Sequence, residues 1–175
     1  MANAPLFTPI SSGSSSGGGG GGSLQWLEDA SAPTSATENQ SLVYLYQAAL
    51  AQNLYCDIKV PSTYSAGSPI ALKLSYYSPD ASGTGLLLTQ STLIRTGTDA
   101  VTSTTNQRTS TNAAVTFTNA NRLLTVSFDV TDSTGKVNAV SVSANDIIKI
   151  RLYRDTDSAT SDIRALVYGA EVTFS

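Results

Sequence analysis

The sequence contains no histidine, a single cysteine and a single tryptophan among its 175 residues, and only 13% of them are charged. The absence of histidine excludes catalytic arrangements that use a histidine base, and it excludes histidine-ligated metal sites. Cys56 is the one cysteine, so no intrachain disulfide can form. The alternation of the segment places it on the same apolar face as Leu54 and Ile58, and we therefore expect a small buried hydrophobe rather than a reactive thiol.

Clusters of basic residues are also missing. The ten lysines and arginines are scattered and the formal net charge is −3, whereas a nucleic-acid-binding protein needs basic side chains gathered on one face. No apolar run approaches the roughly 18 residues of a membrane span. The first residues also lack the charged start and apolar stretch of a signal peptide. We therefore expect a soluble protein made in a cytoplasm, with neither nucleic acid nor membrane as a partner.

The most informative feature that is present is a run of six glycines, Gly17–Gly22. Glycine populates so much of backbone conformational space that such a run cannot hold a fold without outside help. We expect residues 1–23 to form a flexible Ser/Gly-rich arm and residues 24–40 an extended lead-in. Residues 41–175 then form one folded domain, a length that suffices to bury a core.

The arm and the lead-in carry a few sizeable apolar side chains that are candidates for docking onto a partner. They are Leu6, Phe7, Ile10 and Trp26. The alternatives are plain disorder for the arm and packing of Trp26 on its own domain. A short arm attached to a compact domain favours a protein that docks onto others over an enzyme.

From residue 42 onward, apolar residues recur at every second position, which predicts strands with one buried face. The clearest segments are 69–78, 123–130, 146–154 and 166–174, and weaker ones are 41–47, 54–60, 86–95 and 112–117. Only residues 44–53 fit a helical turn as an alternative. Turn signals separate the segments at 65–67, 79–83, 132–135 and 155–158. This spacing predicts an all-β antiparallel sandwich or barrel, and the chain length favours a jelly-roll-like sandwich.

Most candidate catalytic carboxylates lie in predicted turns, where aspartates normally cap backbone amides, so we expect no enzymatic activity. Asp155, Asp157 and Asp162 resemble the clustered oxygen ligands of a calcium loop. Arg154 and Arg164 flank them, however, and this favours a salt-bridged hairpin connection over a cation site. The sequence therefore predicts no metal and no cofactor.

Several of these strand-and-turn segments resemble a domain of virion structural proteins in tailed bacteriophages. The similar segments are 60–67, 76–83, 105–111, 142–157, 162–166 and 170–174, within a resemblance that covers 26–174. The resemblance implies a jelly-roll-like sandwich without enzymatic activity that is oligomeric within a particle, a homotrimer by default. It places the protein in the virion and adds no catalytic or binding residues.

Two functions fit this resemblance. The first is a head decoration, or cement, protein that binds and stabilises the shell through the major capsid protein or other virion proteins. The alternative is a component of a tail fibre, spike or head fibre that acts as a receptor- or glycan-binding module. Tyr77 and Tyr153 lie on predicted polar faces and are candidate sugar-contacting rings. The lack of heptads and repeats favours decoration.

Overall fold

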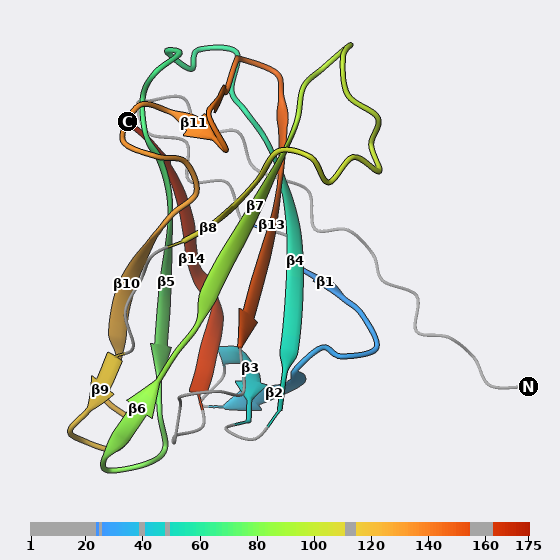
Figure 1. Cartoon of the computed structure of the whole chain (residues 1–175). Coiled ribbons are helices and arrows are strands. Elements are labelled where there is room, and N and C mark those ends of the chain that lie inside the picture. The colour runs from blue at the N-terminus through green and yellow to red at the C-terminus, as the bar shows by residue number, and fades with distance from the viewer. Residues whose placement is uncertain (1–23, 25, 39–40, 48–49, 111–114, 155–162) are drawn as a thin grey trace, which may run out of the picture.

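A computed structural model describes residues 24, 26–38, 41–47, 50–110, 115–154 and 163–175. Its strands form two five-stranded sheets that pack face to face, in the jelly-roll-like sandwich that the sequence predicts (Figure 1). Every strand pair is antiparallel. The described part of the chain contains no helix that could serve as a membrane span.

We call the two sheets A and B. Sheet A has the order β1–β4–β13–β7–β8, with bounds Leu27–Glu28, Gln52–Lys59, Ile147–Arg154, Leu88–Ile94 and Gln107–Thr109. Sheet B has the order β10–β5–β14–β3–β2, with bounds Leu124–Asp129, Ile70–Tyr77, Ile163–Phe174, Ser41–Tyr46 and Thr34–Glu38. Two short ladders pair β6 with β9 (Gly83–Gly85, Val115–Phe117) and β11 with β12 (Lys136–Val137, Val140–Ser141).

The core lies between the sheets and is formed by the apolar faces that the alternation predicts. On β13 it takes Ile148, Ile150 and Leu152, and on β5 it takes Ile70, Leu72, Leu74 and Tyr76, all at most 2% exposed. Cys56 is fully buried among them, and desolvation raises the pKa of its thiol to about 12. The predicted burial of Cys56 is therefore confirmed. A thiol that stays neutral is a poor nucleophile, in line with the expectation of an unreactive cysteine.

The structure refines the predictions for three segments. Residues 44–53, where they are described, end β3 and begin β4, so the predicted strands are confirmed and the helical turn kept as an alternative is not. The lead-in at 24–40 is part of the sheets, because β1 lies at one edge of sheet A and β2 at one edge of sheet B. Strand β14 shifts register against β5 between Ala165 and Ala170, an irregularity that the alternation predicted for 166–174 does not include.

Strand β7 is one exception to the apolar interior. Its inward positions include Thr89 and Ser91, each 1% exposed. The Ser91 hydroxyl donates to the carbonyl of Val130, 2.5 Å away, just past the end of β10 in sheet B. This bond satisfies a buried polar group and connects the two sheets.

Candidate binding surface on the outer face of sheet A

The outer face of sheet A presents polar and aromatic side chains from its two central strands, β4 and β13. The outward side chains alternate with the buried ones and are Asn53, Tyr55, Asp57 and Lys59 on β4 and Ile147, Lys149, Arg151 and Tyr153 on β13. The antiparallel register sets Tyr55 opposite Arg151 and Asn53 opposite Tyr153. Opposed side chains on one face are close enough to interact, so these four residues form a patch.

The turn after β1 adds a carboxylate and a hydroxyl to this patch. Asp29 Oδ1 accepts hydrogen bonds from the Ser31 backbone N–H (2.8 Å) and the Ser31 hydroxyl (2.7 Å). Asn53 Nδ2 donates to Ser31 Oγ at 2.7 Å, and the Asn53 backbone N–H donates to the Ser31 carbonyl at 3.2 Å. These hydrogen bonds hold the turn against the beginning of β4.

Arg151 extends the same chain of hydrogen bonds across the sheet. Its Nε–H donates to Asn53 Oδ1 at 2.8 Å, so both ends of the Asn53 amide are in use. Its guanidinium carbon lies 4.4 Å from the centroid of the Tyr153 ring, a cation–π distance. A hydrogen bond and a ring together fix the plane of the guanidinium before any partner arrives.

Tyr55 closes the network between Arg151 and Asp29. The hydrogen bonds from Ser31, then the one from Tyr55 and the positive charge of Arg151, lower the pKa of the Asp29 carboxyl. Burial first, and then the nearby Asp29, raise the pKa of the Tyr55 phenol. At neutral pH, Asp29 is therefore an ionised acceptor and Tyr55 a neutral hydroxyl. We call Asp29, Ser31, Asn53, Tyr55, Arg151 and Tyr153 the sheet A patch.

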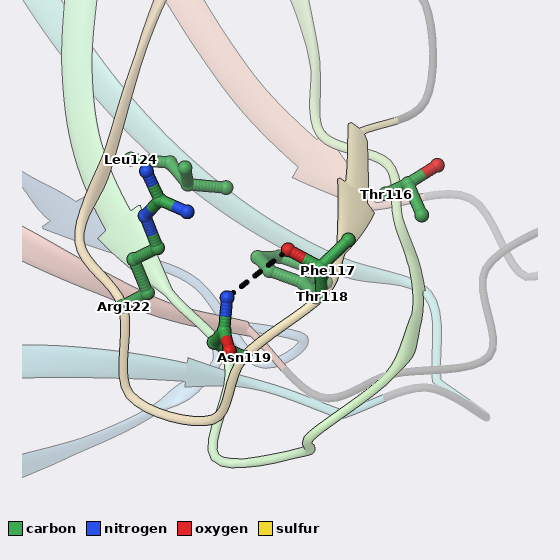
Figure 2. A pocket seen from close by; sticks show the side chains of 6 residues that line it. All are labelled: Thr116, Phe117, Thr118, Asn119, Arg122 and Leu124. Carbon is green, nitrogen blue, oxygen red and sulfur yellow. Dashed lines mark hydrogen bonds between the residues drawn. The ribbon is translucent and has the colours of Figure 1, made fainter.

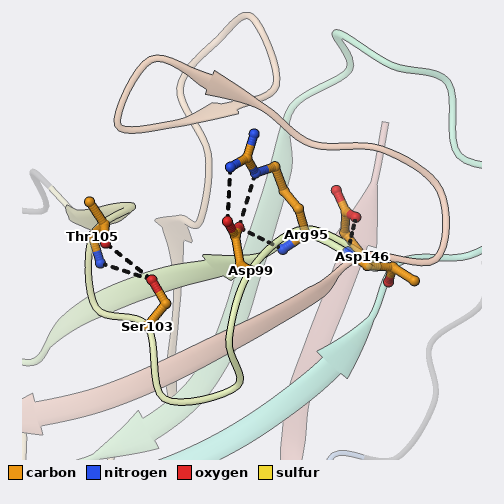
Figure 3. A network of polar contacts seen from close by, with 6 residues as sticks. Arg95, Asp99, Ser103, Thr105 and Asp146 are labelled. Atoms are coloured by element: carbon orange, nitrogen blue, oxygen red, sulfur yellow. Dashed lines mark hydrogen bonds and ion pairs between the residues drawn. The ribbon is translucent and has the colours of Figure 1, made fainter.

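A fixed loop, residues 95–106 between β7 and β8, contacts this face on the side of Lys149. Lys149 Nζ donates to the carbonyl of Val101 at 2.9 Å. At the base of the loop Arg95 pairs with Asp99 at 2.8 Å and also donates to it from its backbone N–H at 2.9 Å (Figure 3). The guanidinium of Arg95 lowers the pKa of Asp99 to about 2, so this carboxyl stays ionised across the physiological range.

Asp146, the residue before β13, also binds this loop through its carboxylate. Its two carboxylate oxygens accept from the backbone N–H groups of Thr96 and Ser143, each at 2.9 Å. The Thr96 hydroxyl in turn donates to the carbonyl of Asn145 at 2.6 Å. The outer face of sheet A therefore has two hydrogen-bonded segments beside it, the 95–106 loop near Lys149 and the 29–32 turn that contributes Asp29 and Ser31 to the patch.

No protein-family model matches this sequence, and no curated protein matches it. Among solved structures, the chain is similar to TmCBM61, solved in complex with β-1,4-galactotriose. The TM-score is 0.43 and the identity 10%, over 87% of this chain and 88% of that one. It is also similar to CBM28, a carbohydrate-binding module specific for non-crystalline cellulose, with a TM-score of 0.43 and 11% identity over 86% of this chain and 88% of that one. At these identities the similarity concerns the fold alone.

The residues that the sequence singles out for docking lie apart from the sheet A patch or outside the described structure. Trp26 is half-buried and packs against the core of its own domain, the second of the two placements predicted for it. Leu6, Phe7 and Ile10 lie outside the described residues, so their docking role stays a prediction.

The two candidate sugar-contacting tyrosines are on different sheets. Tyr153 belongs to the sheet A patch, whereas Tyr77 lies on sheet B and its hydroxyl donates to the Glu38 carboxylate. Asp155, Asp157 and Asp162 lie outside the described residues, and the question of a cation there stays open. Within the described ranges, no group of three or more acidic or cysteine side chains is arranged to hold a metal ion.

A depression at the end of the sandwich near β9 is a weaker candidate. Its lining is Thr116, Phe117, Thr118, Asn119, Arg122 and Leu124 (Figure 2). The hydrogen bond from Asn119 Nδ2 to Thr118 Oγ1, two of the lining side chains, is long at 3.3 Å and joins adjacent residues. Phe117 itself belongs to the core, so this depression offers few polar groups that are fixed in place.

Sequence reasoning missed most of the patch. The alternation places Tyr55, Arg151 and Tyr153 on polar faces, but it does not say which strands are neighbours. The register of β13 on β4 brings these residues together, and the 29–31 turn joins them through Asn53. The Asp-Ala-Ser turn at 29–31 was the one local signal available, because aspartate and serine there suit a side-chain-capped turn.

Proposed function

We propose that this chain is a non-catalytic carbohydrate-binding module that binds its ligand on the sheet A patch. The observation that carries the proposal is the pairing of two tyrosines with planar polar groups that are already held by hydrogen bonds. Arg151 is fixed by Asn53 and Tyr153, and Asn53 is fixed by Ser31. This pre-organisation lowers the entropy cost that binding must overcome.

The chemistry of a sugar fits these groups. A sugar ring presents C–H groups on its faces and hydroxyls around its edge. A tyrosine offers a large apolar surface with a polar tip, which suits the C–H face. Arginine N–H groups donate to hydroxyl oxygens, and the ionised Asp29 accepts from hydroxyl protons. Ligand sites in general combine apolar rings with a few polar groups in fixed positions.

The electrostatics of the patch favour binding over catalysis. A general acid needs a carboxyl whose pKa is raised toward the working pH. The pKa of Asp29 is instead lowered, chiefly by Ser31, so this group is an acceptor at neutral pH. Histidine, the commonest general base, is absent from the whole sequence.

A position on a virion stays a prediction that rests on the sequence resemblance. The sheet A patch favours the glycan-binding alternative over head decoration, because a decoration protein needs no pre-organised polar site on its outer face. Copies per particle separate the two locations: hundreds for a decoration protein, and tens or fewer for a fibre component.

The proposal is tested with the full chain on a panel of immobilised neutral and acidic polysaccharides. We expect Tyr153→Ala to weaken binding about tenfold or more, equivalent to about 1.4 kcal/mol, because a central aromatic contact is lost. Tyr77→Ala on sheet B is the matched control and should bind as the unchanged protein does. Loss of binding with Tyr77→Ala but not with Tyr153→Ala would move the site to sheet B. The absence of binding to any polysaccharide would refute the proposal.

A further inference from the structure

We infer that the ligand of the sheet A patch is an acidic sugar whose carboxylate is bound by Arg151. This inference rests on the proposed function and adds the class of ligand. It starts from a charge without an ion-pair partner. Within the described residues, no carboxylate lies within 4.0 Å of the Arg151 guanidinium, and the Asp29 carboxylate acts on it only from a longer distance.

The groups in contact with Arg151 fix it and carry no charge themselves. Asn53 accepts from Nε–H through a neutral amide oxygen, Tyr153 contributes the face of a neutral ring, and Tyr55 is a further neutral hydrogen-bond neighbour. Arginine carries five N–H donors, and the partners Asn53 and Tyr55 leave several of them unused. The terminal nitrogens thus retain donor capacity in the fork geometry that matches a carboxylate.

The surrounding charges favour an anion as well. Lys59 and Lys149 share the face with Arg151, whereas its acidic members are Asp57 and Asp29. Three positive charges against two negative charges give +1, in a chain whose total is −3. The Asp29 carboxylate is also engaged by both the hydroxyl and the backbone N–H of Ser31. A carboxylate placed against Arg151 therefore meets a locally positive surface.

Lys149 is placed to contribute to the same ligand. It precedes Arg151 by two residues on β13, on the same face, and donates to the Val101 carbonyl at 2.9 Å. An ammonium group has three donors, so two remain. Because the arginine fork matches a carboxylate and the lysine ammonium is only a point charge, Arg151 should contribute more of the selectivity for a carboxylate than Lys149.

The experiment compares acidic polysaccharides with their carboxyl-reduced forms, which keep the backbone and lose the charge. The probes are polygalacturonate, alginate and hyaluronan, and binding of the full chain is measured by affinity electrophoresis and calorimetry. We expect at least a tenfold preference for one acidic form over its reduced counterpart. We also expect that preference to shrink as sodium chloride is raised from about 50 to 500 mM, because salt screens the charges.

Two variants and one control locate the effect. Arg151→Gln should remove the acidic preference, and Arg151→Lys should keep the charge but lose most of the preference because the fork is gone. Lys73→Gln on the outer face of sheet B changes the net charge by the same amount as Arg151→Gln and should leave the preference intact. Melting curves identify any variant that fails to fold. If Arg151→Gln fails to fold, Arg151→Lys and Lys149→Gln take its place.

The outcomes separate the inference from the proposed function. Equal binding to acidic and reduced forms, or binding to neutral polysaccharides alone, would overturn the acidic ligand and leave the carbohydrate site standing. A preference that Lys73→Gln removes as well would mean unspecific charge attraction and would also overturn the inference. Failure to bind any polysaccharide would refute both.

Discussion

Gly135 shows how a single residue decides the backbone of a turn. It has φ of +68°, a region that favours glycine. A Cβ at this position would lie 2.6 Å from the Ser68 carbonyl oxygen and 2.8 Å from the Gly67 carbonyl carbon, and backbone atoms cannot move aside cheaply. The turn at 132–135 therefore packs against the 60–69 loop only because this position carries no side chain.

We expect Gly135→Ala to destabilise the domain by about 2–4 kcal/mol, combining a left-handed backbone with overpacking. Gly97→Ala is the matched control, since Gly97 also has a positive φ, +75°, but a Cβ there would meet nothing within 4 Å. It should cost only about 1–2 kcal/mol. Urea unfolding of both variants measures the difference, and equal losses would mean that close approach at Gly135 is unimportant.

At the scale of strands, the sequence predicts faces well and neighbours poorly. The buried positions of β4, β5 and β13 follow from alternation, because each of these strands has one face in the core. Pairing depends on contacts distant in the sequence. No local sequence pattern indicates the register shift after Ala165 or the hydrogen bond between Asn53 and Arg151. The fold class was therefore predictable, and the sheet A patch was not.

Strand β10 tests the prediction of faces at the edge of sheet B. Phe128 is 1% exposed and lies opposite Leu72 on β5, whereas Thr125 faces outward on the same strand. We expect Phe128→Ala to cost roughly 3–5 kcal/mol, because a buried ring is replaced by a cavity. Thr125→Ala should stay within about 0.5 kcal/mol. Denaturant midpoints measure both, and a cost below about 1 kcal/mol for Phe128→Ala would contradict the assigned core face.

For the whole molecule, the question is whether folding and binding need the first 22 residues. The core cluster described here takes its members from Tyr44 to Val172, and the side chains that pack against it begin at Leu24 and Trp26. Each sheet is likewise built from strands that start at Leu27 or later. The contacts that stabilise the sandwich are therefore present without the glycine-rich segment.

We expect deletion of residues 1–22 to change the free energy of unfolding by no more than about 0.5 kcal/mol. Binding to polysaccharide should also be unchanged, because the sheet A patch begins at Asp29. Trp26→Ala is the contrasting variant and should cost about 1–3 kcal/mol, since its half-buried ring packs on the core. Thermal and urea unfolding measure both changes. A large loss of stability on deletion would mean that the segment is part of the fold.

Light scattering on the same truncated protein separates assembly from docking. A trimer that survives the deletion would place the subunit contacts in the sandwich and leave Leu6, Phe7 and Ile10 available to dock onto a virion partner, as the sequence predicts. Loss of the trimer with an intact fold would instead assign these side chains to the contacts between subunits. A monomer in both forms would mean that the predicted homotrimer forms only within the particle, or that the predicted place in a virion is wrong. Any multivalent binding would then require a particle that holds several copies together.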